Sequence, residues 1–175
     1  MPGNAFIQFP GITGESYQQG HTGDAGWIEI ADWGWDVEAE TSFLKGGGSA
    51  VGKPQPGVLS FTHYYDLSSP VIMTHIVAGK TFPKITIEIL KQIGDDEKGQ
   101  PAVFFQVVLT NAYITKVATK GSEDGAVNQD VEMVFKEIAI GYKPQNNDGT
   151  LAPAMAFGWS VTAMDNTVTN PTSLS

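Results

Sequence analysis

The chain contains no cysteine among its 175 residues, which excludes disulfides, thiol catalysis and thiolate metal sites. It also lacks any apolar run approaching the roughly 18 residues that a membrane-spanning helix needs. The opening residues, MPGNAFIQF, have neither the basic region nor the apolar core of a secretory leader, so we expect no cleaved signal peptide. Basic residues are scarce, with 10 Lys and Arg against 19 Asp and Glu and a net charge of −9. This balance argues against general binding to nucleic acid or to anionic membranes.

Residue patterns of catalytic and metal sites are also missing. Residues 47–53 match the spacing of a phosphate-binding loop, but Pro54 stands where Ser or Thr would hold Mg²⁺, and no helix pattern follows. The acidic groups at 95–97 and 123–124 lie in glycine-flanked turns, where we interpret them as solvated charge. The histidines show neither HxH nor HExxH spacing and are predicted to be structural; they are His21, His63 and His75. We therefore predict a protein that is not an enzyme and holds no metal or cofactor.

What is present is the alternation of a sheet protein. The length fits one domain, with a hydrophobic content of 41% that is typical of globular chains. Gly34 is predicted to mark a bulge or a bend, residues 110–112 a kink, and the chain near Lys136 a further bulge. The segment 45–57 is interpreted as a long loop because it is rich in glycine and proline. Strands are expected at 5–9, 26–33, 35–43, 58–65, 84–92, 103–117, 129–142 and 154–164.

A single short helix interrupts this pattern after residue 66. Alternate residues of the preceding strand, Leu59, Phe61, His63 and Tyr65, are predicted to share one face. Ser68 and Ser69 stand before Pro70, which predicts a serine N-cap followed by a proline at the first helical position. Gly79 is predicted to end the helix in the left-handed conformation. The pattern therefore predicts a mainly β fold, a sandwich or barrel with one short flanking helix.

Trp27, Trp33 and Trp35 share one parity, and we predict that they face the core because tryptophan buries a large apolar area. The residues of opposite parity, Asp32, Gly34 and Asp36, then point out of the subunit. A tryptophan platform for sugars would require the reverse arrangement.

A series of segments along residues 5–163 resembles the Hcp family, the haemolysin-coregulated proteins of bacterial type VI secretion. The segments keep the order of the family, although none is specific by itself. They are FIQFPGITGES from Phe6, IEIADWGW from Ile28, GK at Gly52, LSFTHYYD from Leu59, SSPVIM from Ser68, GKTFPKITIEI from Gly79, FKEIAIGYKPQ from Phe135 and FGW from Phe157. We expect a domain over 1–163 and a polar, flexible tail over 164–175 that matches nothing in the family.

The resemblance implies a β-barrel of two packed antiparallel sheets with one flanking helix. It implies hexameric rings that stack into the inner tube of an injection machine and carry small effector proteins. The partners implied are other copies of the chain, a spike protein, a sheath and the effectors. The location implied is the bacterial cytoplasm during assembly, followed by secretion without a cleaved leader. In such a ring Asp32, Gly34 and Asp36 would face the channel, and an extended loop would reach a neighbouring subunit; its candidate residues are Lys45, Gly46, Gly47, Gly48, Ser49 and Lys53.

Three other functions remain open from the residues alone. A monomeric sandwich could bind carbohydrate or another ligand through tryptophans, and scattered acids and serines leave room for a hydrolase. A phage tail tube subunit would share the physics of the ring and differ only in its genomic setting.

Overall fold

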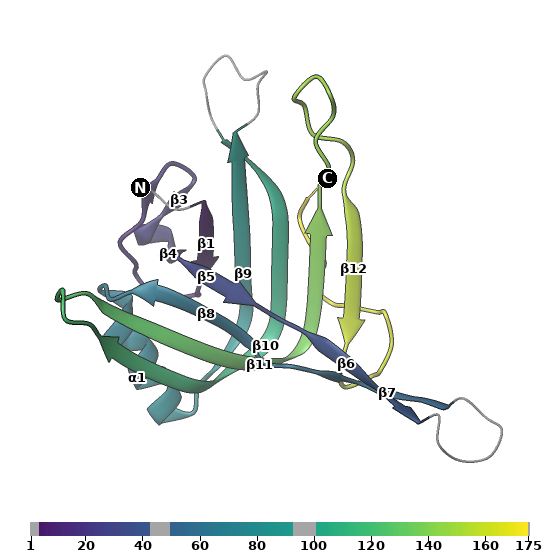
Figure 1. Ribbon diagram of the computed structural model, residues 1–175, viewed down its shortest axis with the longest axis horizontal. Coiled ribbons are helices and arrows are strands. Elements are labelled where there is room, and N and C mark those ends of the chain that lie inside the picture. Colours follow the sequence, from purple (N-terminus) through teal and green to yellow (C-terminus); the bar gives the residue numbers. More distant parts are fainter. Residues whose placement is uncertain (1–3, 43–49, 93–100, 175) are drawn as a thin grey trace.

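The computed structural model describes residues 4–42, 50–92 and 101–174 (Figure 1). Strands dominate, and the described part of the chain has one α-helix, which confirms the predicted fold class. The elements are β1 (Ala5–Gln8), β2 (Tyr17–Gln18), β3 (His21–Thr22), a 3-10 turn (Gly23–Ala25), β4 (Trp27–Ile30), β5 (Asp32–Gly34), β6 (Val37–Ser42), β7 (Ala50–Pro56), β8 (Leu59–Tyr64), α1 (Ser68–Ala78), β9 (Thr81–Gln92), β10 (Pro101–Gly121), β11 (Val127–Tyr142) and β12 (Met155–Ser160).

The main sheet curls until its two ends meet. Its strands follow the order β4-β1-β9-β10-β11-β8-β5, with β12 added beside β11, and every pairing is antiparallel. β4 and β5 lie at opposite ends of this order, yet only Ala31 separates them in sequence. The Ala31 amide donates to the Thr62 carbonyl at 2.8 Å, which ties the β4 end to β8. The sheet therefore forms a nearly closed barrel.

β10 and β11 leave the barrel halfway along their length. β11 pairs with β8 through residues 128–133 and with β12 through residues 137–142. The bend falls at Asn111, which has a positive φ of 51° and interrupts the β10–β11 pairing. This confirms the kink predicted at 110–112. The bulge predicted at Lys136 is wrong, because the register shift between these strands lies between Ile114 and Lys116.

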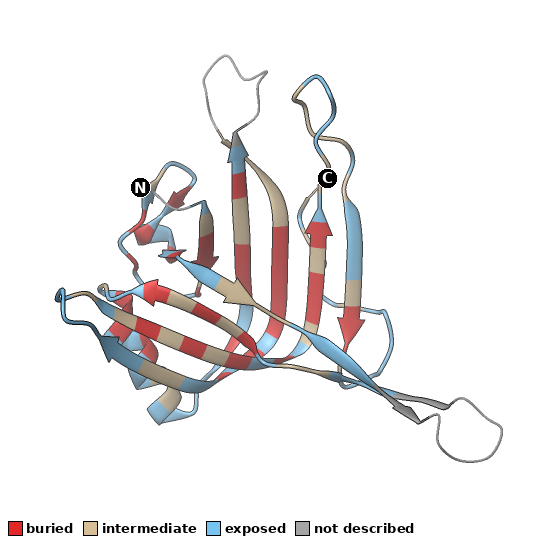
Figure 2. Ribbon diagram, in the orientation of Figure 1, coloured by how far each residue is buried: buried red, intermediate tan, exposed pale blue. Residues whose placement is uncertain are grey.

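The core fills the barrel and continues beneath the helix (Figure 2). Leu59, Phe61 and His63 are buried at alternate positions as predicted, whereas Tyr65 follows the strand and is 41% exposed. The Phe9 ring lies 5.8 Å from Phe61 and 5.1 Å from Phe82, measured between centroids. Aromatic contact across three elements fixes how the barrel closes.

The tryptophans divide between two clusters. Trp33 and Trp35 pack against the main core, as predicted, but Trp27 packs with Phe6 and Leu90 on the outer face of the sheet. The prediction of one shared face is wrong for Trp27 because the strand breaks at Ala31. Before this break the residues of even number, Ile28 and Ile30, enter the barrel.

The helix is capped by a residue that the pattern did not indicate. The Asp66 carboxylate accepts the Ser68 amide at 2.8 Å, and the Ser69 hydroxyl accepts the Asp66 amide at 3.0 Å. The predicted serine N-cap is therefore wrong, since Ser68 and Ser69 lie within the first turn. Pro70 is the third helical residue and not, as predicted, the first, because the helix begins at Ser68. The C-cap prediction is confirmed: Gly79 is left-handed at φ 66° and donates to the Ile76 carbonyl.

Candidate assembly surfaces

The strands β6 and β7 form an arm that leaves the barrel. They pair only with each other, and their ribbon projects from the body at the lower right of Figure 1. Val37 is 45% exposed, and Glu38, Ala39, Lys53 and Gln55 are exposed as well. A two-stranded hairpin with both faces in solvent is marginal by itself. The arm therefore has the character of an element that packs on another molecule.

The base of the arm is fixed to the barrel. The Trp35 indole donates to the Gly57 carbonyl at 3.1 Å, and the Gly57 amide donates to the Asp36 carbonyl at 2.9 Å. Asp36, predicted to face a channel, thus lies at this base, where its side chain covers Gly57. These contacts set the direction in which the arm leaves the subunit.

Part of the predicted inter-subunit loop coincides with the arm. Lys53 is exposed on β7, while Lys45, Gly46, Gly47, Gly48 and Ser49 lie outside the described residues. The loop predicted over 45–57 is wrong for 50–56, which is a strand. Two prolines are tolerated in this strand because it has one partner and an outer edge without ladder bonds.

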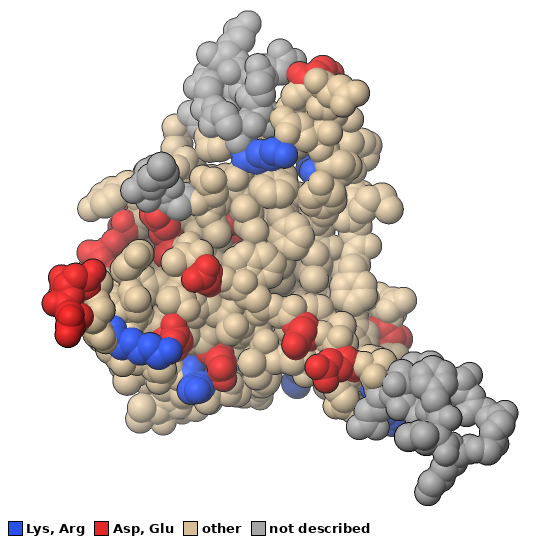
Figure 3. Space-filling model, viewed as in Figure 1, with Lys and Arg blue, Asp and Glu red and all other residues tan. Residues whose placement is uncertain are grey.

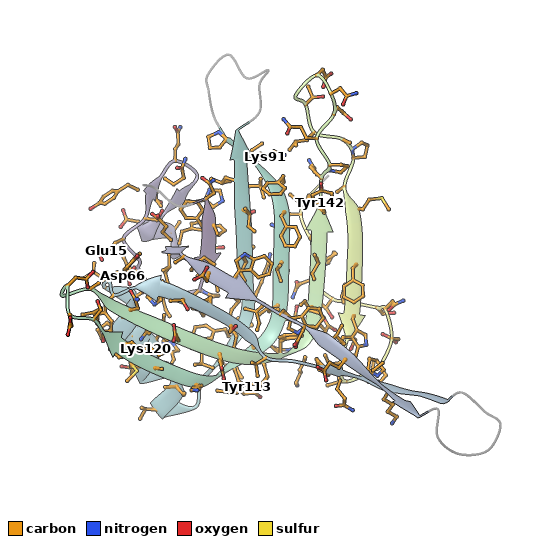
Figure 4. The ribbon with its side chains drawn as sticks, viewed as in Figure 1. Glu15, Asp66, Lys91, Tyr113, Lys120 and Tyr142 are labelled. Carbon is orange, nitrogen blue, oxygen red and sulfur yellow. The ribbon has the colours of Figure 1, made fainter. Side chains whose placement is uncertain are left out.

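A second surface is apolar and lies where β10, β11 and β12 extend past the barrel. We call it the open sheet face; its residues are Phe105, Ile140, Tyr142, Met155 and Phe157. The register places Tyr142 beside Phe105 and Met155, and Ile140 beside Phe157. Met155 is 73% exposed and Phe157 45% exposed. Figure 3 shows few charged groups over these strands, and Tyr142 is labelled in Figure 4. An apolar face of this kind on a domain marks a contact site.

The open sheet face ends at a strand edge. In the described part of the chain, the second edge of β12 is bonded only at Ser160, by Met164 and Asp165, so the rest of this edge offers backbone groups for pairing. Exposed edges associate with other chains unless they are blocked. The apolar side chains and the strand edge thus favour the same kind of contact.

A third surface is polar and covers the outside of the barrel. Asp32 pairs in register with Thr62, whose hydroxyl donates to Asp130 at 2.7 Å, and Lys120 lies 2.7 Å from the other Asp130 oxygen. Gly34 lies on the same outer side, opposite Ser60. The structure thus brings Asp32 and Gly34 together on one polar face and separates Asp36 from them.

This polar face makes stability depend on pH. The Lys120 ammonium, and then the Thr62 hydroxyl, lower the pKa of the Asp130 carboxyl, and Asp130 raises the pKa of Lys120. A carboxyl with a lowered folded pKa stabilises the fold above its unfolded pKa of about 3.9 and loses this effect as pH falls through the folded value.

We therefore expect Asp130→Asn to unfold more easily in urea at pH 7, by at most about 1 kcal/mol. The difference from the unchanged protein should shrink as pH falls below about 4. Glu123→Gln, at an exposed turn, is the matched control and should show little change. An Asp130→Asn difference of the same size at pH 2.5 and at pH 7 would contradict the assignment.

The histidines serve packing. His21 Nε2 lies 3.1 Å from Glu88 Oε1, and His63 Nε2 lies 2.6 Å from Gln129 Oε1. The His75 ring stacks on Phe82 at 4.8 Å between centroids. Among the residues that the structure describes, no three His, Asp or Glu side chains gather to hold a metal ion.

One surface hollow has no tryptophan in its lining. It has a volume of about 540 Å³, and its walls include Glu15, Glu29, Asp66, Tyr64 and Tyr65. Trp27 and Trp159 are each only 6% exposed. Trp33 and Trp35 are half-buried and pack against the main core, so none of the four tryptophans forms an exposed sugar platform. No helix in the described ranges is long and apolar enough to cross a membrane.

The open sheet face was not found from the sequence. The alternation of Met155, Phe157 and Trp159 predicted a strand, but Trp159 is buried whereas the other two are exposed. Alternation shows which residues share a face and does not show where the covering layer ends. The face is uncovered because β8 ends before it reaches this part of β11. The sequence pattern did not show where β8 ends relative to β11.

Comparison with known proteins agrees with this architecture. The family described as "Type VI secretion system effector, Hcp" matches residues 6–142. Protein hcp1 of Pseudomonas aeruginosa is 28% identical over 163 residues, covering 92% of this chain and 96% of that protein.

Solved structures give the same result. A type six secretion system protein has a TM-score of 0.81 at 25% identity, covering 92% of this chain and 97% of its own. Hcp1 from Salmonella typhimurium has a TM-score of 0.73 at 25% identity, covering 95% and 100%. The family match spans most of the barrel and the sheet that extends from it, and by that match the chain belongs to the Hcp family of type VI secretion.

Proposed function

We propose that this chain is the structural subunit of the type VI secretion inner tube. Copies associate as hexameric rings, the rings stack, small effector proteins travel in the lumen, and the subunit itself is exported. Its work is assembly, without catalysis and without a cofactor. Its partners are further copies of the chain and the spike, sheath and effector proteins of the same machine.

The main support for this proposal is that one subunit has two different surfaces that are each suited to contact another copy. The arm and the open sheet face are formed by different strands and differ in shape. Contacts between unlike surfaces are heterologous and close into a ring when the rotation per subunit permits. A single self-complementary patch would instead favour a two-fold dimer.

Charge decides which contacts hold the ring. Subunits of net charge −9 repel each other, so closure depends on apolar burial and edge pairing. Stacking between rings is then weaker than closure and responds to ionic strength. Sedimentation velocity at low micromolar concentration should give a mass of about 112 kDa, a hexamer of the 18.7 kDa chain. A species of 18.7 kDa alone would contradict the proposal.

The polar face is proposed to line the channel, with Asp32 and Gly34 on it, while Asp36 lies apart at the base of the arm. A polar, hydrated wall lets cargo pass without tight adhesion. Because the chain has no cysteine, Asp32→Cys provides a unique attachment point for a gold cluster. In electron micrographs the label should lie at the inner margin of the ring. A label at the outer rim would assign this face to the outside.

A further inference from the structure

The C-terminal segment crosses the sheet instead of leaving it. Met164, with a positive φ of 57°, turns the chain after β12, and Asp165 bridges back to Ser160. The segment then passes over Gly158 of β12 with Val168 and reaches Gln106 of β10 with Ser173. This face of the sheet is the outer one, opposite the open sheet face.

Side chains of the sheet bind the backbone of the segment. The Glu137 carboxylate accepts the Thr169 amide at 2.8 Å and the Thr169 hydroxyl at 3.1 Å. Gln106 accepts the Ser173 amide at 2.7 Å and donates to the Ser173 hydroxyl at 2.9 Å. Gln106 is 3% exposed, and a buried amide requires such partners. These contacts give hydrogen-bond partners to both the oxygen and the nitrogen of the Gln106 side-chain amide.

Two glycines leave room for the segment. A Cβ at Gly141 would lie 2.8 Å from Thr172 Oγ1, and a Cβ at Gly158 would lie 3.0 Å from Val168 Cγ2. Neither glycine is among the residues with positive φ, so the backbone does not require glycine at these positions. Glycine inside a strand weakens it and often marks the close approach of another backbone. Both positions are therefore glycine because the C-terminal segment leaves no room for a side chain, and not because of their backbone conformation.

The same contacts continue to the other end of the chain. Gln106 Nε2 also donates to Glu88 Oε2 at 3.0 Å, and the other Glu88 oxygen lies 3.1 Å from His21 Nε2. His21 belongs to the small β2–β3 hairpin. Through Glu88 and Gln106 the C-terminal segment is thus linked to the N-terminal hairpin.

We propose that the outer face of β10, β11 and β12 is a docking site for an extended, hydroxyl-rich polypeptide segment. Residues 165–174 of the same chain are its occupant. The site is shaped by Gly141 and Gly158 and recognises its occupant through Glu137 and Gln106. The proposal is independent of the tube function, and it opposes the flexibility that composition predicts for 164–175.

Paired cysteines in the cysteine-free chain test the occupant. The double variant is Gly141→Cys, Thr172→Cys. The Cβ of residue 172 lies 3.1 Å from the position that a Cβ at residue 141 would take, which is close to the Cβ–Cβ distances that a disulfide accepts. Mild oxidation should give an intrachain disulfide, with one chain per band on a non-reducing gel. Covalent dimers would show that the segment comes from a second copy, which would overturn the proposal.

Hydrogen exchange supplies a second test on the full chain. The amides of Thr169 and Ser173 should be protected, and Gly141→Val should reduce this protection by about tenfold or more. Adding Thr172→Gly should restore it. Gly121→Val is the matched control, because a Cβ at this β10 glycine meets nothing within 4 Å. Tail amides that exchange like an unstructured peptide in the unchanged protein would overturn the proposal, as would equal protection in Gly141→Val.

Discussion

Phe157→Asp is expected to convert the proposed ring into a folded monomer of 18.7 kDa. Phe157 lies in the open sheet face opposite Ile140 and is 45% exposed in the single subunit. If this face is covered in the ring, the new carboxylate is buried without a partner, which costs several kcal/mol. The cost recurs at every contact around the ring, so self-association should weaken by roughly a hundredfold or more. Sedimentation velocity measures the mass, and circular dichroism confirms that the sheet remains.

The matched control is Tyr17→Asp. Tyr17 is an aromatic residue that is 96% exposed on β2, away from both the arm and the open sheet face. Tyr17→Asp should leave the proposed ring intact. This control separates an effect at the open sheet face from the general effect of added negative charge. A Phe157→Asp protein that sediments as the full ring would remove the open sheet face from the account.

Shortening the arm should have a comparable effect for a different reason. Residues 38–55 can be replaced by Asn-Gly, because Val37 and Pro56 already pair across the hairpin and Asn-Gly forms a two-residue turn. None of the arm residues whose side chains the structure describes belongs to the barrel core, so the subunit should remain folded. Loss of the packing area should leave mostly monomer at concentrations where we propose that the unchanged protein forms rings.

A milder variant tests whether ring assembly depends on the contacts that the arm makes or only on the length of the arm. Lys53→Glu keeps the strand and reverses one exposed charge on it. If the arm contacts acidic surface on the neighbour, the ring should weaken and become more sensitive to low salt, where repulsion is least screened. Full-size rings from the shortened protein would contradict the role of the arm.

Local patterns predicted the elements of this fold well. The alternation at Leu59, Phe61 and His63 gave the buried face of β8, and Gly79 gave the end of α1, because both depend on neighbours close in sequence. The family resemblance supplied the barrel, which no local pattern specifies. The placement of Asp32 and Gly34 on an outer face followed from the parity of Trp33.

The surfaces were harder to predict because a residue is exposed or buried according to which distant elements of the chain cover it. Trp27 changed face at a break marked only by Ala31, and β7 is a strand although it contains Pro54 and Pro56. The tail composition predicts flexibility, whereas the docking that we propose for residues 165–174 rests on contacts with Gln106 and Gly141, which lie far away in the sequence. Such long-range contacts carry no signal within a short window.

Negative-stain electron microscopy of the unmodified protein tests the central claim most directly. The account predicts annular particles with a central hole, which join end to end when conditions favour stacking. A field of compact particles without a hole, at the size of a single chain, would contradict it.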